Sequence, residues 1–205
     1  MRLILVRHGE TEYNRNALAL GRADVPLNEK GIRQAAALEF ALAEEKIAAI
    51  YSSPLQRALD TATRVAAPHG LEVAVEERLI EMDIGELEGL TFPEIGKAHP
   101  DLYQNWGGPD GPTYRMPGSN ETLTDVQARA RLALEQMLAR HPDETVVAVT
   151  HNFVILTTLA WLLTIELAEF RRMRHSVAAI SSVEMGAGRV QVITLNDTSH
   201  LRGIE

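Results

Sequence analysis

The 205-residue sequence contains no cysteine, so disulfide bonds and thiolate metal sites are both excluded. Basic residues are also scarce, because 20 Lys and Arg stand against 28 Asp and Glu and give a formal net charge of -8. A protein that binds nucleic acid non-specifically needs the opposite balance to neutralise phosphates. We therefore expect no nucleic-acid partner, and we expect a small anionic ligand to bind in a locally positive pocket.

Long apolar runs are missing as well. The apolar start covers only residues 3–6, which is too short for a signal peptide, and no run approaches the length of a membrane span. No Ser/Gly/Pro-rich linker divides the chain, and 45% hydrophobic with 23% charged residues is an ordinary globular composition. These features predict one domain over residues 1–205, a cytoplasmic location and no membrane partner. They leave the oligomeric state open.

The segments that are present alternate between strand-like and helix-like patterns. Residues 3–6 and 146–149 are apolar at consecutive positions, which is typical of strands covered on both faces of a parallel sheet. Further strands are expected at 47–51 and 71–75, with a hairpin of 177–183 and 190–195 joined by Gly186, Ala187 and Gly188. Helices are expected at 28–45, 53–67, 123–140 and 152–163. This order predicts a three-layer α/β/α sandwich whose central sheet is mostly parallel, with an antiparallel edge.

Capping residues mark several helix starts. Asn28 is a suitable N-cap, and Thr91 with Glu94 predicts a short helix. Residues 53–56 have the Ser-x-x-Gln form of a capping box, with Pro at the first helical position. Arg57 would then lie beside the positive end of the helix dipole, where both could bind one anion. Residues 78–89 are expected to form an acidic loop, and residues 107–118 a flap over one face.

Two of the buried strands end at histidines, in Arg7-His8 and in Thr150-His151. If these strands are parallel neighbours, both imidazoles lie in one crevice at their carboxyl ends. A neutral imidazole is a nucleophile toward phosphorus, and Arg7, Arg57 and a protonated His151 would stabilise the negative oxygens around it. This chemistry requires no metal ion.

A leaving alkoxide also needs a proton. A carboxyl group in a partly desolvated loop would have its pKa raised enough to supply one. The acidic loop offers Glu81, with Asp83, Glu86 and Glu88 as alternatives.

Several segments in order along the chain form one recognisable set. They are Arg7 to Thr11 with Asn14, Gly21 to Asp24 with Pro26 and Leu27, Tyr51 to Leu55 with Arg57, Ala58, Thr61 and Ala62, the loop from Glu81 to Gly89, and Val149 to His151. Through these segments, which cover nearly its whole length, the chain resembles the histidine phosphatase superfamily, in the branch of cofactor-dependent phosphoglycerate mutases and small broad-specificity phosphatases.

The resemblance implies that His8 is the histidine that becomes phosphorylated. It assigns the binding of the phosphate group to Arg7, Arg57 and His151, and it makes Glu81 the proton donor. It selects Glu81 from the four acidic candidates. Asn14 and Gly21 correspond to further substrate contacts.

Three positions depart from the family pattern. Asn152 and Phe153 follow the second histidine where relatives commonly have glycine, so Asn152 is expected either to bind substrate or to cap the next helix. Leu87 replaces a common tryptophan, which indicates a packing change. Residues 117–122 resemble the family's Pro-Gly-Gly-Glu-Ser segment with one residue inserted, so the flap is expected to close differently.

The other histidines show no metal-ligand spacing, so we predict no metal and no cofactor. Four of them are expected at the surface: His69, His99, His141 and His175. His200 is expected to pack near the C-terminus, with a contact to the site as the alternative.

Together these features predict a metal-independent phosphatase that hydrolyses a small phosphorylated metabolite through phosphohistidine at His8. A sugar phosphate, a phosphoglycerate-like acid, phosphoserine and α-ribazole phosphate all remain open as substrates. The alternatives are a cofactor-dependent phosphoglycerate mutase and a phospho-ligand-binding protein without turnover. The compact chain favours hydrolysis, because mutases of this family tend to have extra segments that close the site.

Overall fold

A computed structural model describes residues 1–186 and 188–204, and the strands in this part form one sheet in the order β3-β2-β4-β1-β5-β6. The strands are β1 Arg2–Arg7, β2 Ile47–Ser52, β3 Val73–Val75, β4 Thr145–Thr150, β5 Ile180–Gly186 and β6 Arg189–Asp197. Strands β1 to β4 are parallel to one another, and β5 pairs antiparallel with β1 and β6. The predicted α/β class with an antiparallel edge is confirmed, while Ala187 of the predicted hairpin turn lies outside the described residues.

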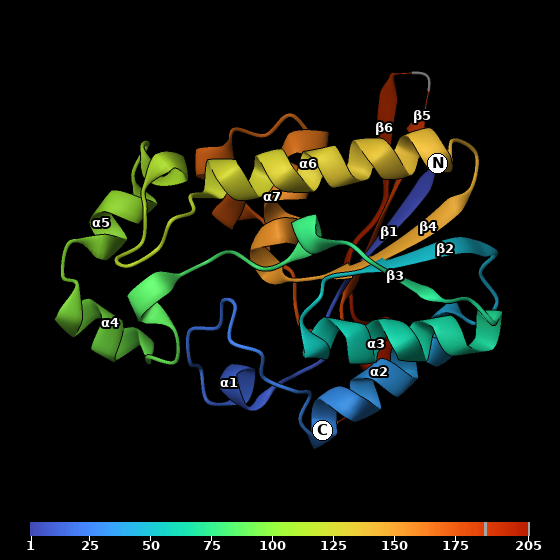
Figure 1. The fold of residues 1–205 in the computed structure, drawn as a ribbon, viewed down its shortest axis with the longest axis horizontal. Helices are drawn as coiled ribbons and strands as arrows, with labels where there is room; N and C mark the ends of the chain where they lie inside the picture. Colours follow the sequence, from blue (N-terminus) through green and yellow to red (C-terminus); the bar gives the residue numbers. More distant parts are fainter. Residues whose placement is uncertain (187, 205) are drawn as a thin grey trace.

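Helices cover both faces of the sheet, with α6 and α7 on one side and α2 and α3 on the other (Figure 1). The smaller helices α4 and α5 lie beyond the carboxyl ends of the parallel strands (Figure 1). The α-helices are α1 Glu12–Arg15, α2 Glu29–Leu42, α3 Gln56–Ala66, α4 Phe92–Ala98, α5 Leu102–Gly107, α6 Leu123–Arg140 and α7 Asn152–Leu162. Short 3-10 helices occur at Ala67–His69, Glu77–Leu79, Gly85–Leu87, Gly111–Thr113, Leu167–Arg172 and Ser199–Leu201.

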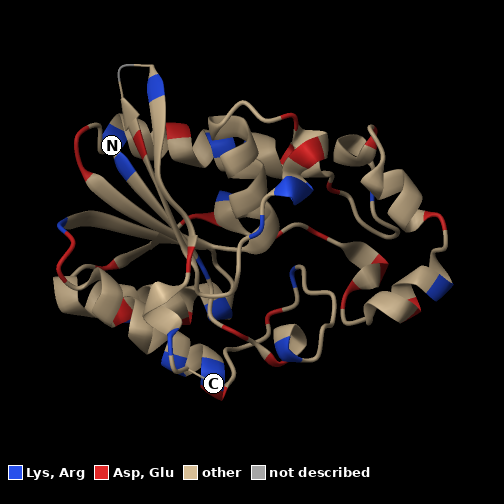
Figure 2. Ribbon diagram, turned by 180° about the vertical axis from the view of Figure 1, so that it is seen from behind, with Lys and Arg blue, Asp and Glu red and all other residues tan. Residues whose placement is uncertain are grey.

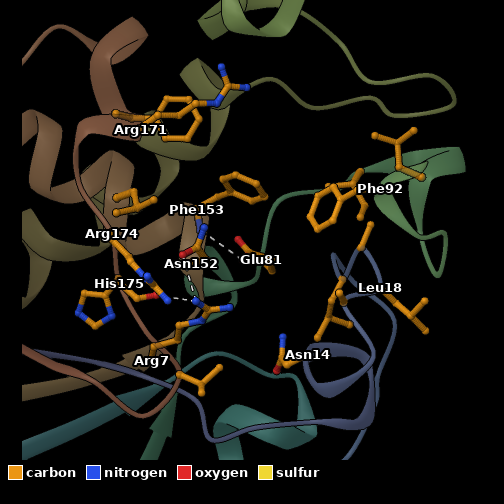
Figure 3. Close-up of a pocket in the computed structure, with 18 of the residues that line it drawn as sticks. Arg7, Asn14, Leu18, Glu81, Phe92, Asn152, Phe153, Arg171, Arg174 and His175 are labelled. Carbon is orange, nitrogen blue, oxygen red and sulfur yellow. Dashed lines mark hydrogen bonds between the residues drawn. The ribbon is translucent and has the colours of Figure 1, made fainter. Parts of the chain in front are cut away.

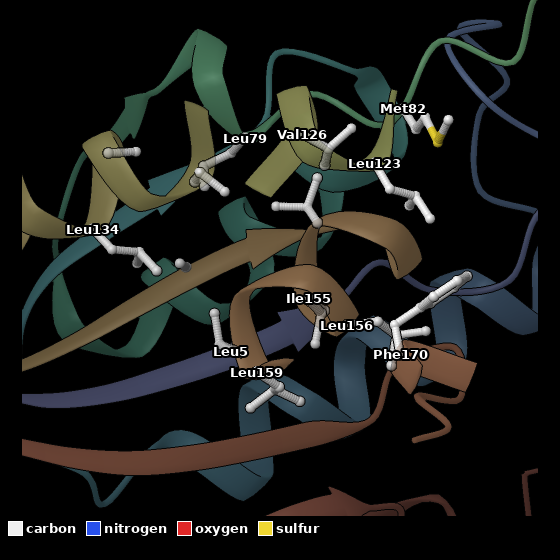
Figure 4. Packing of buried hydrophobic residues seen from close by; sticks show 14 of the residues in the cluster. Leu5, Leu79, Met82, Leu123, Val126, Leu134, Ile155, Leu156, Leu159 and Phe170 are labelled. Carbon is white, nitrogen blue, oxygen red and sulfur yellow. The ribbon is translucent and has the colours of Figure 1, made fainter. Parts of the chain in front are cut away.

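Strand β1 divides the core into two parts, because successive side chains point to opposite faces of the sheet. Leu3 and Leu5 belong to the cluster under α6 and α7, where Leu5 lies near Leu159 (Figure 4). Ile4 and Val6 belong to the cluster under α2 and α3. The continuous apolar run therefore reflects burial on both faces, as expected of a central parallel strand.

Two predicted element starts are wrong for identifiable reasons. Helix α3 begins at Gln56, after an N-cap Leu55 that makes no side-chain capping bond, so the Ser53 capping box does not form. The hydroxyl of Ser53 lies instead 2.6 Å from Nε2 of His151. Strand β5 begins at Ile180 and not at 177, because Ala178 has a φ of 54° and its N–H donates to the carbonyl of His8.

The predicted flap has more local structure than expected. Helix α5 extends to Gly107, a 3-10 turn covers Gly111–Thr113, and Met116 is buried. The Asn28 cap and the Thr91 capping box form as predicted.

Charged residues lie mainly on the helices and loops, while the middle of the sheet carries almost none (Figure 2). Among the helices of the described residues, none combines the length and hydropathy needed to cross a bilayer.

Helix α2 offers a matched test of this packing. Leu38 is fully buried in the core, whereas Phe40 on the same helix is 87% exposed. We expect Leu38→Ala to lower the free energy of unfolding by about 2–5 kcal/mol through lost burial and a cavity. Phe40→Ala should change it by less than about 0.5 kcal/mol. Urea unfolding of both variants measures the difference, and similar losses would contradict this packing.

Candidate active site

Strands β1 and β4 bring the two strand-end histidines together, as the sequence predicts. Arg7 pairs with Thr150 in the parallel register, and the N–H of His8 donates to the Thr150 carbonyl at 3.1 Å. The ring centroids of His8 and His151 are 5.1 Å apart. Both side chains are buried, so a ligand that reaches them leaves bulk water.

The ring of His8 is held in one orientation. Its Nδ1 donates to the Gly9 carbonyl at 2.7 Å, which leaves Nε2 with a free lone pair. Burial lowers the pKa of His8 well below its usual value, and the charges of Arg57 and Arg7 lower it further. The imidazole is therefore neutral at physiological pH.

The loop after His8 depends on glycine at position 9. A Cβ on Gly9 would lie 2.6 Å from the carbonyl oxygen of Gly31 in α2. Only a residue without a side chain lets the loop pack this closely on the helix. Gly9 thus supports the position of the carbonyl that orients His8.

Ser53 orients the second histidine, a role that its sequence context did not predict. Its Oγ lies 2.6 Å from Nε2 of His151 and also accepts from the Leu55 N–H at 3.3 Å. Nδ1 of His151 is buried and has no hydrogen-bond partner among the described residues. Burial, followed by the charge of Arg57, lowers the pKa of His151 well below its usual value, which disfavours the protonated form expected from the sequence. An unpaired polar atom in this position is suited to a ligand.

Arg57 lies in the first turn of α3, as predicted, and its side chain is fully buried. Its two terminal nitrogens donate to the carbonyls of Ala23 and Gly21, both at 2.7 Å. Its Nε has no partner within the described part of the chain. Burial lowers the pKa of Arg57, while nearby acidic groups, with Glu81 first, oppose that shift.

The guanidinium of Arg7 is held by Asn152 and His175. Its Nη1 donates to Oδ1 of Asn152 at 3.2 Å and to the carbonyl of His175 at 2.5 Å. Burial lowers the pKa of Arg7 to about 10, so the guanidinium stays charged at neutral pH. Its Nε, like that of Arg57, is unpaired among the described residues. The two arginines therefore keep hydrogen-bond donors free beside the histidines.

Gly21 holds Arg57 rather than lining the cavity. Its carbonyl accepts from Arg57, and its N–H donates to the carboxylate of Glu88 at 2.8 Å. A Cβ at this position would lie 2.7 Å from the Ile84 side chain. Glu88 also accepts from the N–H groups of Arg22 and Ala23, so its carboxylate organises this whole loop.

Of the four acidic candidates in the loop, Glu81 is the residue that lines the cavity. It is buried, and its carboxylate accepts from the N–H groups of Met82 at 2.8 Å and Phe153 at 3.2 Å. Burial raises the pKa of Glu81, although these two N–H groups and the nearby arginines oppose the shift. Of the alternatives, Glu88 holds the Gly21 loop and Asp83 accepts from Gly85 and Asn120. The geometry thus agrees with the choice of Glu81.

Two arginines fix the backbone beneath Glu81. Nε of Arg22 and Nη2 of Arg129 both donate to the Glu81 carbonyl, at 3.1 and 3.2 Å. The carboxylate of Glu121 pairs with both arginines, at 3.1 Å to Arg22 and 2.7 Å to Arg129. Arg22, Glu81 and Glu121 are far apart in the sequence, so no local motif predicts this support.

The candidate residues open onto a cavity of about 810 Å³. Arg7, Asn14, Glu81 and Asn152 surround one end of it (Figure 3). The side-chain oxygen of Asn14 accepts from the Thr11 N–H, which leaves its amide nitrogen for a ligand. His8 also lines the cavity, whereas Arg57 and His151 are fully buried and are not among its lining residues.

Asn152 does not cap helix α7, so that alternative is wrong. It is the first helical residue, and the N-cap is His151 without a side-chain capping bond. Its side chain instead binds Arg7 and lines the cavity.

The expectation that His175 lies at the surface is also wrong. His175 is buried, and its Nε2 lies 2.9 Å from the hydroxyl of Ser181. His69, His99 and His141 are half-buried. His200 packs as expected, with Nε2 donating to the Ala178 carbonyl at 3.0 Å. In the described part of the chain, no three His, Asp or Glu side chains form a group that could hold a metal ion.

The family model of the histidine phosphatase superfamily (branch 1) matches residues 3–198, and the chain therefore belongs to this superfamily. Phosphoserine phosphatase 1 of Hydrogenobacter thermophilus is 34% identical over 201 residues, which cover 98% of this chain and 94% of that protein. The metal-independent phosphoserine phosphatase of Arabidopsis thaliana is 36% identical over 158 residues, 75% of this chain and 65% of that protein. Some curated mycobacterial relatives are longer, and the chain spans 55% of their length.

Solved structures agree with this assignment. Bacillus stearothermophilus YhfR superposes with a TM-score of 0.89 at 33% identity, over 100% of this chain and 99% of that one.

Because His175 is buried, we expect the stability of the fold to depend on pH. Burial, with the charge of Arg7, lowers the pKa of His175 from 6.5 to about 4. Between these values the unfolded chain binds a proton that the folded chain does not, so stability falls as the pH drops from 6.5 to about 4. This one group accounts for about 3 kcal/mol of that loss. We expect His175→Gln to lose correspondingly less stability than wild type over this range, as measured by urea unfolding, and equal losses would contradict the burial of a neutral imidazole.

Proposed function

We propose that this chain, acting as a single domain, hydrolyses small phosphomonoesters through a phosphohistidine on His8, without a metal ion. The observation that carries the proposal is the neutral His8 ring, whose Nδ1 donates to the Gly9 carbonyl and whose Nε2 keeps its lone pair. The phosphatases among its relatives support the same class of reaction.

In the first step, the lone pair of His8 Nε2 forms a bond to phosphorus while the ester P–O bond breaks. The proton on the Glu81 carboxyl group moves to the departing alkoxide and yields the free alcohol. The raised pKa of Glu81 favours the protonated form that this step needs. The products of the step are the alcohol, phosphohistidine and the Glu81 carboxylate.

In the second step, the Glu81 carboxylate takes a proton from water as the water oxygen attacks phosphorus. The P–N bond breaks and returns the electron pair to Nε2 of His8. Inorganic phosphate leaves, and Glu81 is protonated again for the next cycle.

Positive charge for both transition states comes from Arg7 and Arg57, whose Nε groups are unpaired among the described residues. Preorganised cations in a desolvated site stabilise developing negative charge strongly. If Ser53 donates its hydroxyl hydrogen to Nε2 of His151, Nδ1 of that ring carries a hydrogen and adds a further donor. The metal-independent name of the Arabidopsis relative agrees with catalysis by these groups alone.

Leaving-group dependence tests the roles of His8 and Glu81. We expect wild type to release phosphate from propyl phosphate and from p-nitrophenyl phosphate in EDTA, and His8→Ala to release none from either. Glu81→Gln should lower kcat/KM for propyl phosphate by about 10²–10⁴-fold, because propoxide needs a proton. It should lower kcat/KM for p-nitrophenyl phosphate much less, since p-nitrophenolate leaves unprotonated and kcat/KM does not include the later attack of water.

A phosphate-release assay across both substrates measures these effects. Equal release by His8→Ala and wild type would overturn the proposal, and so would loss of wild-type activity in EDTA. An equal effect of Glu81→Gln on kcat/KM for both substrates would remove Glu81 as the proton donor.

A further inference from the structure

The cavity continues beyond the phosphate end into an apolar chamber, which we define by Leu18, Ile84, Trp106, Met116, Phe153 and Phe170. We propose that the preferred substrates are phosphomonoesters whose alcohol carries a large apolar group, an alkyl chain or an aromatic ring, that binds in this chamber. This inference rests on the proposed function, because it concerns the leaving group of the same reaction.

Three aromatic rings from different elements form one wall of the chamber. The ring centroid of Trp106 in α5 lies 5.5 Å from that of Phe153 in α7 and 5.9 Å from that of Phe170. Phe153 and Phe170 are 6.2 Å apart. Rings at these distances and tilts contact each other edge to face, so they form a stable apolar surface.

The chamber begins where the leaving group would be protonated. The N–H of Phe153 donates to the Glu81 carboxylate, so the ring of Phe153 follows directly on the proton donor (Figure 3). An alcohol whose oxygen receives the Glu81 proton therefore directs its carbon chain past Phe153. Burial of that chain stabilises the bound substrate by about 0.8 kcal/mol for each methylene.

Arg171, the basic residue at the aromatic wall, already contacts two of its rings. The guanidinium carbon of Arg171 lies 4.4 Å from the Trp106 ring centroid and 5.2 Å from that of Phe170. Arg171 also donates to the Trp106 carbonyl at 3.3 Å. Arg171 lines the cavity, but its guanidinium is stacked on these two rings, so a small zwitterionic alcohol such as serine would meet mainly apolar surface in the chamber.

The size of the cavity also favours substrates with a large apolar group. Its volume of about 810 Å³ falls in the range of roughly 300–1,000 Å³ that is typical of pockets for drug-sized ligands. Phosphate and a three-carbon alcohol fill only a small part of such a space. A longer apolar group would fill the rest and displace water from hydrophobic walls.

A series of primary alkyl phosphates tests the chamber. Propyl, hexyl and 3-phenylpropyl phosphate have leaving groups of similar acidity, so differences in kcat/KM report binding of the carbon chain. We expect kcat/KM to rise by about fourfold per methylene, or about 60-fold from propyl to hexyl phosphate. O-Phosphoserine, measured beside them, should be a poorer substrate than hexyl phosphate.

Variants locate the effect in the chamber. Phe170→Ala, which removes a buried ring of the wall, should lower the hexyl-to-propyl ratio of kcat/KM by about tenfold. Phe92→Ala provides a second variant that spares the buried core, since Phe92 is 59% exposed and lies at the chamber mouth near Leu18 (Figure 3). It should lower the ratio by about two- to threefold. Phe40→Ala, which removes an exposed ring of α2, is the control and should leave the ratio unchanged.

The outcomes separate this inference from the proposed function. If wild type hydrolyses propyl and hexyl phosphate equally, or prefers phosphoserine to hexyl phosphate, the chamber inference is overturned while phosphatase activity stands. The chamber inference is also overturned if folded Phe170→Ala keeps the wild-type hexyl-to-propyl ratio of kcat/KM. If Phe170→Ala does not fold, an unchanged ratio in Phe92→Ala overturns the inference instead. If no alkyl phosphate releases phosphate in a His8-dependent way, the proposed function itself fails.

Discussion

The active site is organised by the burial of two arginines beside two imidazoles. Guanidinium groups are costly to remove from water unless their hydrogens are paired. Their terminal nitrogens donate to backbone carbonyls, those of Gly21 and Ala23 for Arg57 and that of His175 for Arg7, and Arg7 also donates to Asn152. Burial first, and then the positive charge of the arginines, lowers the pKa of both histidines.

Much of the loop structure follows from that arrangement. Glu88 holds the backbone that presents the Gly21 carbonyl, and Glu121 holds the two arginines that fix the Glu81 carbonyl. Both carboxylates thus act on backbone positions, whereas the carboxylate of Glu81 lines the cavity. The net negative charge of the chain is compatible with anion binding, since Glu88 and Glu121 are paired with backbone N–H groups and arginines.

The central strands and the two histidines were predictable because their signals are local. Residues 3–6 and 146–149 are apolar throughout, and each run leads directly to Arg7-His8 or Thr150-His151. The caps at Asn28 and Thr91 depend on side chains within one helical turn, and they form as predicted. The family resemblance added Glu81, whose burial depends on tertiary packing.

The errors arise where a distant contact decides the outcome. Ser53 has the sequence of a helix cap, but His151 lies 98 positions away and takes its hydroxyl. His175 has an ordinary polar neighbourhood in the sequence and is buried through Ser181 and Arg7. The apolar chamber could not be predicted from the sequence for the same reason. Its rings Trp106, Phe153 and Phe170 come from three separate elements.

The most direct test of the account is to locate the phosphoryl group during turnover. Wild type is mixed with hexyl phosphate, quenched in alkali within the first turnover and digested, and the peptides are analysed by mass spectrometry under alkaline conditions that preserve phosphohistidine. We expect a transient phosphoryl group on His8 that appears and decays within the first turnover. Rapid phosphate release with no phosphorylated His8 at any time, or with the phosphoryl group on another residue, would contradict it.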